Sequence, residues 1–401
     1  MKYHPITDTI DLQASQRDIL DTHEFKSVYP TLSEYLDSFE QQGIPAKNDL
    51  KQLLNFLVTG LSNAKGTQSR FRNEAERFTL FCWREREKSV LDTKLEDIKL
   101  YIDWIWSPPK TLIADTTISS RFKYRPNSDI RVVNPEWRPF VHRTPKANRK
   151  IESLIAPGKA SSTKHAYKIS QTSLRNSYAS LNVFFKWLID AELVMRNYLA
   201  DAKKNCKYLI KVKIYQPPHT FDDEVWETFI QCLTVAADEN PKFEIHRFVV
   251  LSLKVLFLRI SELSSRDYYT PLFNHFRPDP SNEGWVLHVV GKGKKERVVT
   301  VPDSYIENVL GRYRESMDLA PLPRIDEDTP ILPSMKTGKP LKQDSVNNIV
   351  EEAFDLVIST LMKSGKKQQA LDIAGASSHW LRHTGATQAL DELNETMLAE
   401  E

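Results

Sequence analysis

Apolar residues recur at helical spacing along most of the chain. In residues 67–106 and again in residues 174–193 (LRNSYASLNVFFKWLIDAEL), apolar side chains fall on one face of a helix. We therefore predict helices in both stretches. We also expect Trp83, Trp104 and Trp106 to pack in a core rather than to stack on bases, because large aromatic side chains dominate core packing.

The second half of the chain predicts helices around one small sheet. Residues 245–258 (IHRFVVLSLKVLFL) are apolar enough for a buried helix. The β-branched runs at 285–290 (WVLHVV) and 296–302 (ERVVTVP) are joined by GKGKK, which predicts an antiparallel hairpin. The fold class is therefore mainly α with a small antiparallel sheet. Further helices are predicted at 303–317, 343–365 and 378–390.

Prolines interrupt the helical pattern in the middle of the chain. Between 107 and 160 they recur among Arg and Lys, which predicts an irregular basic insertion. Pro217–Pro218 mark a domain boundary, and Thr220 is the expected N-cap of the next helix. The predicted division is an N-terminal helical segment of unknown role (1–66), a helical domain (67–205) with the insertion at 107–160, a basic linker (206–219) and a second domain (220–401).

The overall net charge of +2 hides a strongly basic middle block. Residues 107–216 hold 21 Lys and Arg against 7 Asp and Glu, a net charge of +14. Residues 1–106 carry −3 and residues 217–401 carry −9. The block predicts a polyanionic partner, and a solvated face or a disordered linker is the alternative.

The cysteines and the hydropathy indicate the compartment. Cys82, Cys206 and Cys232 are far apart, which excludes a disulfide framework or a CxxC motif and is typical of reducing conditions. No apolar run reaches the roughly 18 residues of a membrane helix, and the first residues contain no apolar signal region. We therefore expect a cytoplasmic protein without a membrane partner.

The first candidate site is Arg259, directly after the apolar helix, with Glu262 three residues later. A guanidinium at the end of a buried helix needs a carboxylate, backbone carbonyls or a bound phosphate. Arg259 therefore either pairs with Glu262 to hold the turn or binds a phosphate. The local sequence favours neither.

The second candidate site is the basic hairpin tip, Gly291–Arg297. It lacks the GxxxxGK[ST] spacing of a nucleotide-binding P-loop, and it joins two strands rather than a strand and a helix. A basic β-turn fits a groove of DNA, but it could also be an ordinary solvated turn.

The third candidate site is the run His379-Trp380-Leu381-Arg382-His383. On a helix, His379, Arg382 and His383 lie on nearly the same side, because residues three and four apart are neighbours. A zinc site is a weak alternative, because HxxxH here has no glutamate after the first histidine and no third ligand.

These three motifs, in this order, resemble the catalytic domain of the tyrosine recombinases, also called the phage integrase family. The family's first box is R-x-[SG]-E-L, its hairpin lysine lies in a GKGxKxR-type turn, and its second box is H-x-L-R-H. The matching residues are Arg259, Ser261, Glu262 and Leu263, then Lys292, then His379, Leu381, Arg382 and His383.

The resemblance implies both a fold and an activity. The fold is a helical core-binding (SAM-like) domain at 67–205 and a mainly helical catalytic domain with a small antiparallel sheet at 220–401. The activity is site-specific recombination or integration of double-stranded DNA, as in mobile genetic elements, through a phosphotyrosyl intermediate. The family needs no metal or other cofactor and acts as homo-oligomers on DNA.

The resemblance also implies a role for each matching residue. Arg259 and Arg382 would clamp the scissile phosphate, since guanidinium forks suit its developing charge. Lys292 would protonate the leaving oxygen, and His379 would accept the proton of the nucleophile. The supporting residues would be Glu262 and His383, and DNA contacts would come from Lys294, Lys295 and Arg297.

One part of the family's site has no counterpart here. The family places a further His or Trp and then the nucleophilic tyrosine after the second box, but no tyrosine follows Arg382. Tyr305 and Tyr313 lie far upstream in another predicted helix. Asn394 is the expected start of a short last helix. We therefore expect a catalytic domain that is C-terminally incomplete and does not cleave DNA by itself.

Two other functions compete with an active recombinase. One is a catalytically dead DNA-binding remnant or regulator from a mobile element. The other is an RNA-binding or scaffold protein, against which the ordered set Arg259, Lys292, His379 and Arg382 argues.

Overall fold

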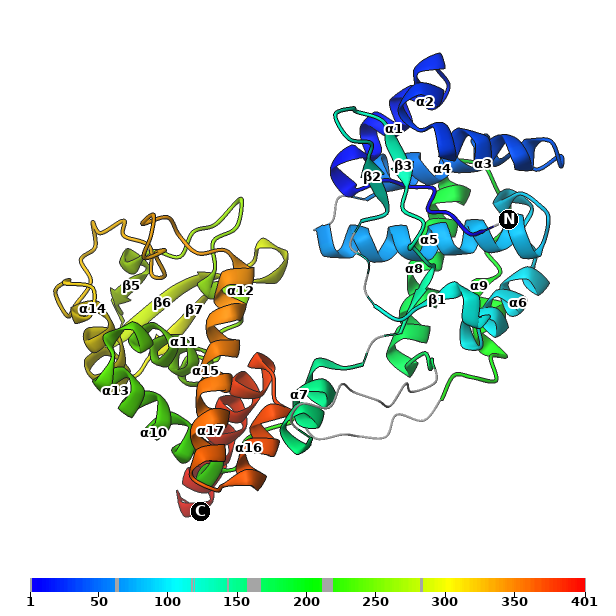
Figure 1. Cartoon of the computed structure of the whole chain (residues 1–401). Coiled ribbons are helices and arrows are strands. Elements are labelled where there is room, and N and C mark those ends of the chain that lie inside the picture. Colours follow the sequence, from blue (N-terminus) through cyan, green and yellow to red (C-terminus); the bar gives the residue numbers. More distant parts are fainter. Residues whose placement is uncertain are drawn as a thin grey trace. The chain divides into compact units, whose positions relative to one another are not determined.

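The computed structural model contains two compact units, both mainly helical (Figure 1). Unit 1 comprises Met1–Thr144 and Thr163–Ile214, and unit 2 comprises Pro145–Ser162 and Tyr215–Glu401. Most of the predicted linker, residues 211–218, lies outside the described residues. In the part of the chain that the structure describes, no helix has the length and apolar character to cross a membrane. The described residues are 2–61, 65–116, 118, 120–142, 144–156, 167–210, 219–281 and 284–400.

One hydrophobic core runs through unit 1 and includes helices on both sides of residue 66. Leu36, Leu53, Phe78 and Phe184 are fully buried in it and come from four different helices. The N-terminal helices therefore share a core with the helices that follow, which differs from the sequence-based division. The helices of unit 1 are α1 (Gln13–Ile19), α2 (His23–Val28), α3 (Pro30–Glu40), α4 (Ala46–Thr59), α5 (Lys65–Glu85), α6 (Leu95–Trp106), α8 (Gln171–Asp190) and α9 (Leu199–Lys204).

The predicted packing of the tryptophans is confirmed. Trp83 is buried and donates to a carboxylate oxygen of the buried Asp49 over 2.7 Å. Trp104 and Trp106 are partly buried against the same core. None of these three indole rings is presented as a free stacking surface.

Most of the proline-rich insertion folds onto unit 1. Arg131 donates from Nε to Asp8 Oδ2 over 2.8 Å, and Arg121 forms an ion pair with Glu76; all four side chains are buried. These two positive charges are neutralised inside the protein, so part of the charge of the basic block is unavailable to a partner. The short strands here are β1 (Ile113–Ala114), parallel to β4 (Phe140–Val141), and β2 (Phe122–Tyr124), antiparallel to β3 (Arg131–Val133).

The end of the insertion forms a helix that belongs to unit 2. In α7 (Lys146–Ile155), Lys146 pairs with Glu351 over 2.8 Å, and Lys150 pairs with Asp355 over 2.6 Å. Ile151, on the same helix, packs against the core of unit 2. The insertion is therefore divided between the units, because its last apolar residues find their partners on unit 2.

Unit 2 places helices around a three-stranded antiparallel sheet, as the pattern predicts (Figure 1). The predicted hairpin is confirmed, with Val290 opposite Glu296 at its end. The strands are β5 (Phe276–Pro278), β6 (Trp285–Val290) and β7 (Glu296–Val301), in that order. The helices are α10 (Asp223–Glu239), α11 (Glu244–Val255), α12 (Ile260–Leu263), α13 (Asp303–Tyr305) continued by a π-helical turn (Ile306–Gly311) and α14 (Arg312–Glu315), then α15 (Gln343–Lys363), α16 (Lys367–Ala374) and α17 (Ser378–Glu400).

Two predicted helix starts are wrong. The N-cap of α10 is Asp222, not Thr220, because the Asp222 carboxylate accepts the backbone N–H of Val225 over 2.8 Å. No new helix begins at Asn394, because α17 continues through it. In both cases a residue type that favours the N-cap is present, but the helix does not begin there.

We predict that Arg131→Ala lowers the free energy of unfolding of unit 1 by about 3 kcal/mol, because it leaves the buried Asp8 carboxylate without its partner. Lys123→Ala is the matched control, since Lys123 forms an exposed pair with Glu136 at 3.8 Å and should cost under about 0.5 kcal/mol. Chemical denaturation measures both. Equal costs would contradict a structural role for Arg131.

Candidate phosphate-binding site

The centre of the site is Glu262, whose side chain is fully buried. Its Oε2 accepts the backbone N–H of Arg259 over 2.7 Å, and its Oε1 accepts Arg259 Nη1 over 3.1 Å. Arg297, from β7, donates two further hydrogen bonds to the same carboxylate over 3.1 and 2.9 Å. Burial raises the pKa of Glu262, but the hydrogen bonds and charges of Arg297 and Arg259 outweigh this and hold that pKa below its usual value.

A second anchor of the site is the carbonyl oxygen of Phe257. Phe257 adopts a φ of +48°, which turns its backbone out of the helical direction at the end of α11. The carbonyl accepts Arg297 Nη2 over 3.3 Å and also accepts Arg382 Nη1. The first-box and second-box arginines, more than 100 residues apart in the chain, thus meet around one short turn.

Close packing of α17 on α11 brings Arg382 to this turn. At Gly385, any Cβ atom would overlap the carbonyl oxygen of Lys254 in α11. Thr384 is buried, and its hydroxyl accepts the backbone N–H of Phe221 over 2.9 Å. Trp380 stacks on His219, with ring centres 4.9 Å apart. One helix face therefore docks α17 through small and aromatic residues and leaves Arg382 half-buried at the site.

The three guanidinium groups are close enough to affect one another. Burial lowers the pKa of Arg382, and the positive charges of Arg259 and Arg297 lower that pKa further. Arg259 and Arg297 bond to the single Glu262 carboxylate, and Arg382 lies close enough for the charge of Glu262 to affect its pKa. Three positive charges beside one negative charge leave an excess of positive charge. The side chain of Arg259 remains 43% exposed, so an anion from solvent can reach it.

The hairpin tip lies directly against this cluster. A Cβ at Gly291 would be 3.0 Å from Glu262 Oε1 and 3.9 Å from Arg259 Nη1, so the turn after β6 passes over the first box. Lys292 follows Gly291 and is exposed. The structure therefore places the backbone of the predicted general acid beside the predicted phosphate clamp.

The remaining predicted residues lie in different environments. His379 and His383 are exposed on α17, and His379 precedes Arg382 by three residues on the same side of the helix. Lys294 lies with its Nζ 5.2 Å from the centre of the Tyr268 ring, and Lys295 is exposed. Within the described residues, no group of three or more His, Cys, Asp or Glu side chains is arranged to hold a metal ion.

Arg297 differs from its predicted role as a DNA contact. Its guanidinium donates two hydrogen bonds to Glu262 and one to Phe257, so three of its five N–H groups point into the protein. The sequence places it on the same basic turn as Lys294 and Lys295, and only the fold turns its side chain inward.

Tyr305 and Tyr313, the upstream tyrosines of the helix after the hairpin, are core residues. Tyr305 is buried, and its hydroxyl shares a 2.6 Å hydrogen bond with Ser252. Tyr313 is buried and donates to the carbonyl of Ile331 over 3.0 Å. Burial raises the pKa of both hydroxyls. Neither hydroxyl is available to attack a phosphate.

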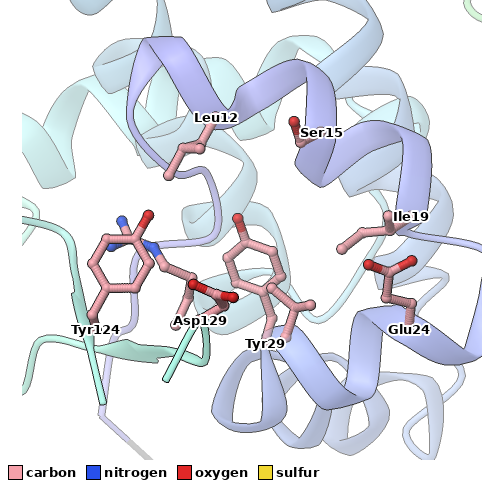
Figure 2. Close-up of a pocket in the computed structure, with 9 residues that line it drawn as sticks. Leu12, Ser15, Ile19, Glu24, Tyr29, Tyr124 and Asp129 are labelled. Carbon is pink, nitrogen blue, oxygen red and sulfur yellow. The ribbon is translucent and has the colours of Figure 1, made fainter. Parts of the chain in front are cut away.

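A hollow of about 230 Å³ lies in unit 1, between α1, α2 and the β2–β3 hairpin (Figure 2). Tyr29, Tyr124, Asp129 and Arg131 line it. The only cationic side chain in its lining, Arg131, is neutralised by Asp8. This hollow therefore does not suit a phosphate, and the arginine cluster of unit 2 does.

The chain is similar to site-specific recombinases of known structure. XerH bound to its difH substrate matches with a TM-score of 0.44 and 13% identity, over 100% of this chain and 92% of XerH. A lambda integrase dimer on a core site matches with 0.40 and 12%, over 84% and 87%. The integrase of mycobacterium phage Brujita matches with 0.25 and 14%, over 88% and 78%. No family profile and no curated protein sequence matches.

The site is defined by the contacts among its own residues in unit 2. The sequence patterns do not identify Phe257 or Gly385 as part of this site. A glycine inside a helix costs about 1 kcal/mol relative to alanine, so Gly385 carried a signal of close packing. The positive φ of Phe257 had no signal in its residue type.

We predict that Gly385→Ala destabilises unit 2 by about 3 kcal/mol or more and withdraws Arg382 from Phe257, because α17 must move away from α11. Gly375→Ala is the matched control, since a Cβ there meets its nearest neighbour at an ordinary 3.6 Å. Thermal unfolding compares the two variants. A loss for Gly385→Ala no larger than the control would contradict the close packing.

Proposed function

We propose that unit 2 binds a phosphodiester of double-stranded DNA between Arg259 and Arg382, as the framework of a site-specific tyrosine recombinase. The observation that carries the proposal is the convergence of three arginines on one turn, with the Lys292 turn beside them. Arg259 and Arg297 bond to the buried Glu262 carboxylate, and Arg382 bonds to the Phe257 carbonyl that Arg297 also contacts. The excess positive charge suits an anion, and planar guanidinium groups suit phosphate oxygens.

Each residue of the cluster has a separate task in this proposal. Glu262 and Phe257 orient the arginines, and Arg259, whose side chain is half-exposed, receives the phosphate. Preorganised donors of this kind stabilise the charge that develops on phosphoryl oxygens during cleavage. Lys292 would supply a proton to the leaving 5′ oxygen, and His379 would accept the proton of an attacking hydroxyl.

The charge of the site and the spacing of its residues favour duplex DNA as the ligand. The Lys292 turn and Arg259 lie on one surface of unit 2, as a backbone phosphate and its leaving oxygen require. The basic block in the middle of the chain adds further sequence-independent affinity, reduced by the two arginines that are paired internally. XerH and lambda integrase were both solved on DNA. A cytoplasmic location and homo-oligomers on DNA remain predictions.

We also propose that the 401 residues bind DNA without cleaving it by themselves. No tyrosine follows Arg382, and Tyr305 and Tyr313 are buried. The covalent step needs an attacking hydroxyl, and neither Tyr305 nor Tyr313 supplies one. The second candidate function, a catalytically dead DNA-binding regulator or remnant of a mobile element, shares the DNA binding and lacks the cleavage.

We predict salt-dependent binding to duplex DNA in preference to structured RNA. Arg259→Ala should weaken binding about tenfold and reduce the slope of log affinity against log salt by about 1, because one phosphate contact is lost. Arg277→Ala is the matched control, an exposed arginine of β5 that donates to Asn274 over 2.9 Å. Fluorescence anisotropy measures both. A preference for RNA, or affinity that is independent of salt, would exclude the recombinase framework.

We predict that the 401-residue chain forms no covalent adduct with nicked duplexes that trap a phosphotyrosyl intermediate. The nicked duplexes are prepared from a library of genomic fragments. An active tyrosine recombinase on its own site is the positive control. Denaturing electrophoresis and peptide mass spectrometry detect an adduct. A DNA-linked tyrosine in this chain would overturn the proposal that it does not cleave.

A further inference from the structure

The turn that carries Lys292 is fastened on both sides by two neighbouring residues, Arg266 and Tyr268. Arg266 Nη2 donates to the carbonyl of Val290, the last residue of β6. Its Nη1 donates to the hydroxyl of Tyr268 over 2.7 Å. On the other side of the turn, Lys294 Nζ lies 5.2 Å from the centre of the Tyr268 ring. Lys292 therefore lies between two anchored residues.

The anchoring segment is itself held in place. The backbones of Arg266 and Tyr269 exchange two hydrogen bonds, of 2.8 and 3.1 Å, and Ser265 donates to the carbonyl of Leu341 over 2.8 Å. The Arg266 guanidinium lies 4.8 Å from the Tyr268 ring centre and 5.3 Å from that of Tyr269. Two hydrogen bonds and two aromatic contacts select one arrangement of this long side chain.

The same segment also carries the phosphate clamp. Arg259 caps α12, which ends three residues before Arg266, and Glu262 within α12 fixes Arg259. Gly291, at the start of the turn, lies so near Glu262 that a Cβ there would be 3.0 Å from its Oε1. One stretch of backbone thus sets the position of the clamp and of the turn that bears the lysine.

We propose that Arg266, together with Tyr268, is a positioning residue that holds the Lys292 turn over Arg259, so that both side chains reach one phosphodiester. The inference rests on the proposed function. A lysine side chain is flexible about its four rotatable bonds, so the protein positions its ammonium group mainly by fixing the backbone that carries it. Misplacement of a reacting group by about 1 Å can cost roughly a hundredfold in rate.

The alternative is that Arg266 itself contacts DNA. Against it, both terminal nitrogens of Arg266 already donate to Val290 and Tyr268. A double-mutant cycle with Lys292 separates the two roles, because a positioning residue acts through Lys292 and a DNA contact does not.

The first experiment measures order in the turn by hydrogen exchange of the full-length protein without DNA. In Arg266→Ala, amides between 291 and 296 should exchange about tenfold faster, because the anchor of Val290 is lost. Arg266→Lys should behave alike, since one ammonium cannot bridge both acceptors. Tyr268→Phe, which loses only the hydroxyl, should give a smaller increase. Arg277→Ala, the control on β5, should leave these amides unchanged.

The second experiment measures affinity for duplex DNA against salt for Lys292→Ala, Arg266→Ala and the double variant. Lys292→Ala should reduce the salt slope by about 1, and the double variant should also reduce it by about 1. A reduction of about 2 in the double variant would show that Arg266 is an independent phosphate contact. Unchanged exchange in Arg266→Ala would equally overturn the positioning role.

The two experiments separate the inference from the function on which it rests. If wild-type protein did not bind duplex DNA, the proposed function would fail, whereas the exchange result would still report whether Arg266 holds the turn. If DNA bound with the expected salt slope but the turn were indifferent to Arg266, only the positioning role would fail.

Discussion

The buried carboxylate of Glu262 is the interaction on which unit 2 depends. A buried carboxylate is stable only when its oxygens are saturated with donors, and here they receive the backbone of Arg259 and the side chains of Arg259 and Arg297. Those donors come from α12 and from β7, so satisfying one charge joins a helix start to the sheet. The same hydrogen bonds leave the guanidinium of Arg259 half-exposed to solvent. The contacts that stabilise Glu262 therefore also form the basis of an anion site.

The arginine of the second box joins this centre by a different kind of force. Arg382 reaches Phe257 because α17 packs against α11 at Gly385, where the backbones approach too closely for any side chain. The ionic contacts at Glu262 and the close helix packing at Gly385 therefore both position arginines at the turn of Phe257. The result is an excess of positive charge beside the Lys292 hairpin, an arrangement that a bound phosphate would neutralise.

Unit 1 uses charge in the opposite way. Its basic insertion is tied down by Arg121 on Glu76 and Arg131 on Asp8, all buried. A lysine or arginine in the sequence can thus either contact a polyanion or form a buried ion pair within the protein. Net charge does not distinguish these two uses. The net charge of the middle block is therefore larger than the positive charge that unit 1 has available for a polyanion.

Most helices, the hairpin and the three motifs can be predicted from the amino-acid sequence, because periodicity and turn chemistry are local properties of neighbouring residues. The roles expected for Arg259, Lys292 and Arg382 came from the resemblance of these motifs to those of the tyrosine recombinases. Only the folded structure shows that Arg297 points inward to Glu262 and that Phe257 and Gly385 shape the site. Only the folded structure shows that Arg266 contacts the turn. These depend on which carbonyls and carboxylates lie nearby after folding, and partners far apart in the chain leave no pattern along it.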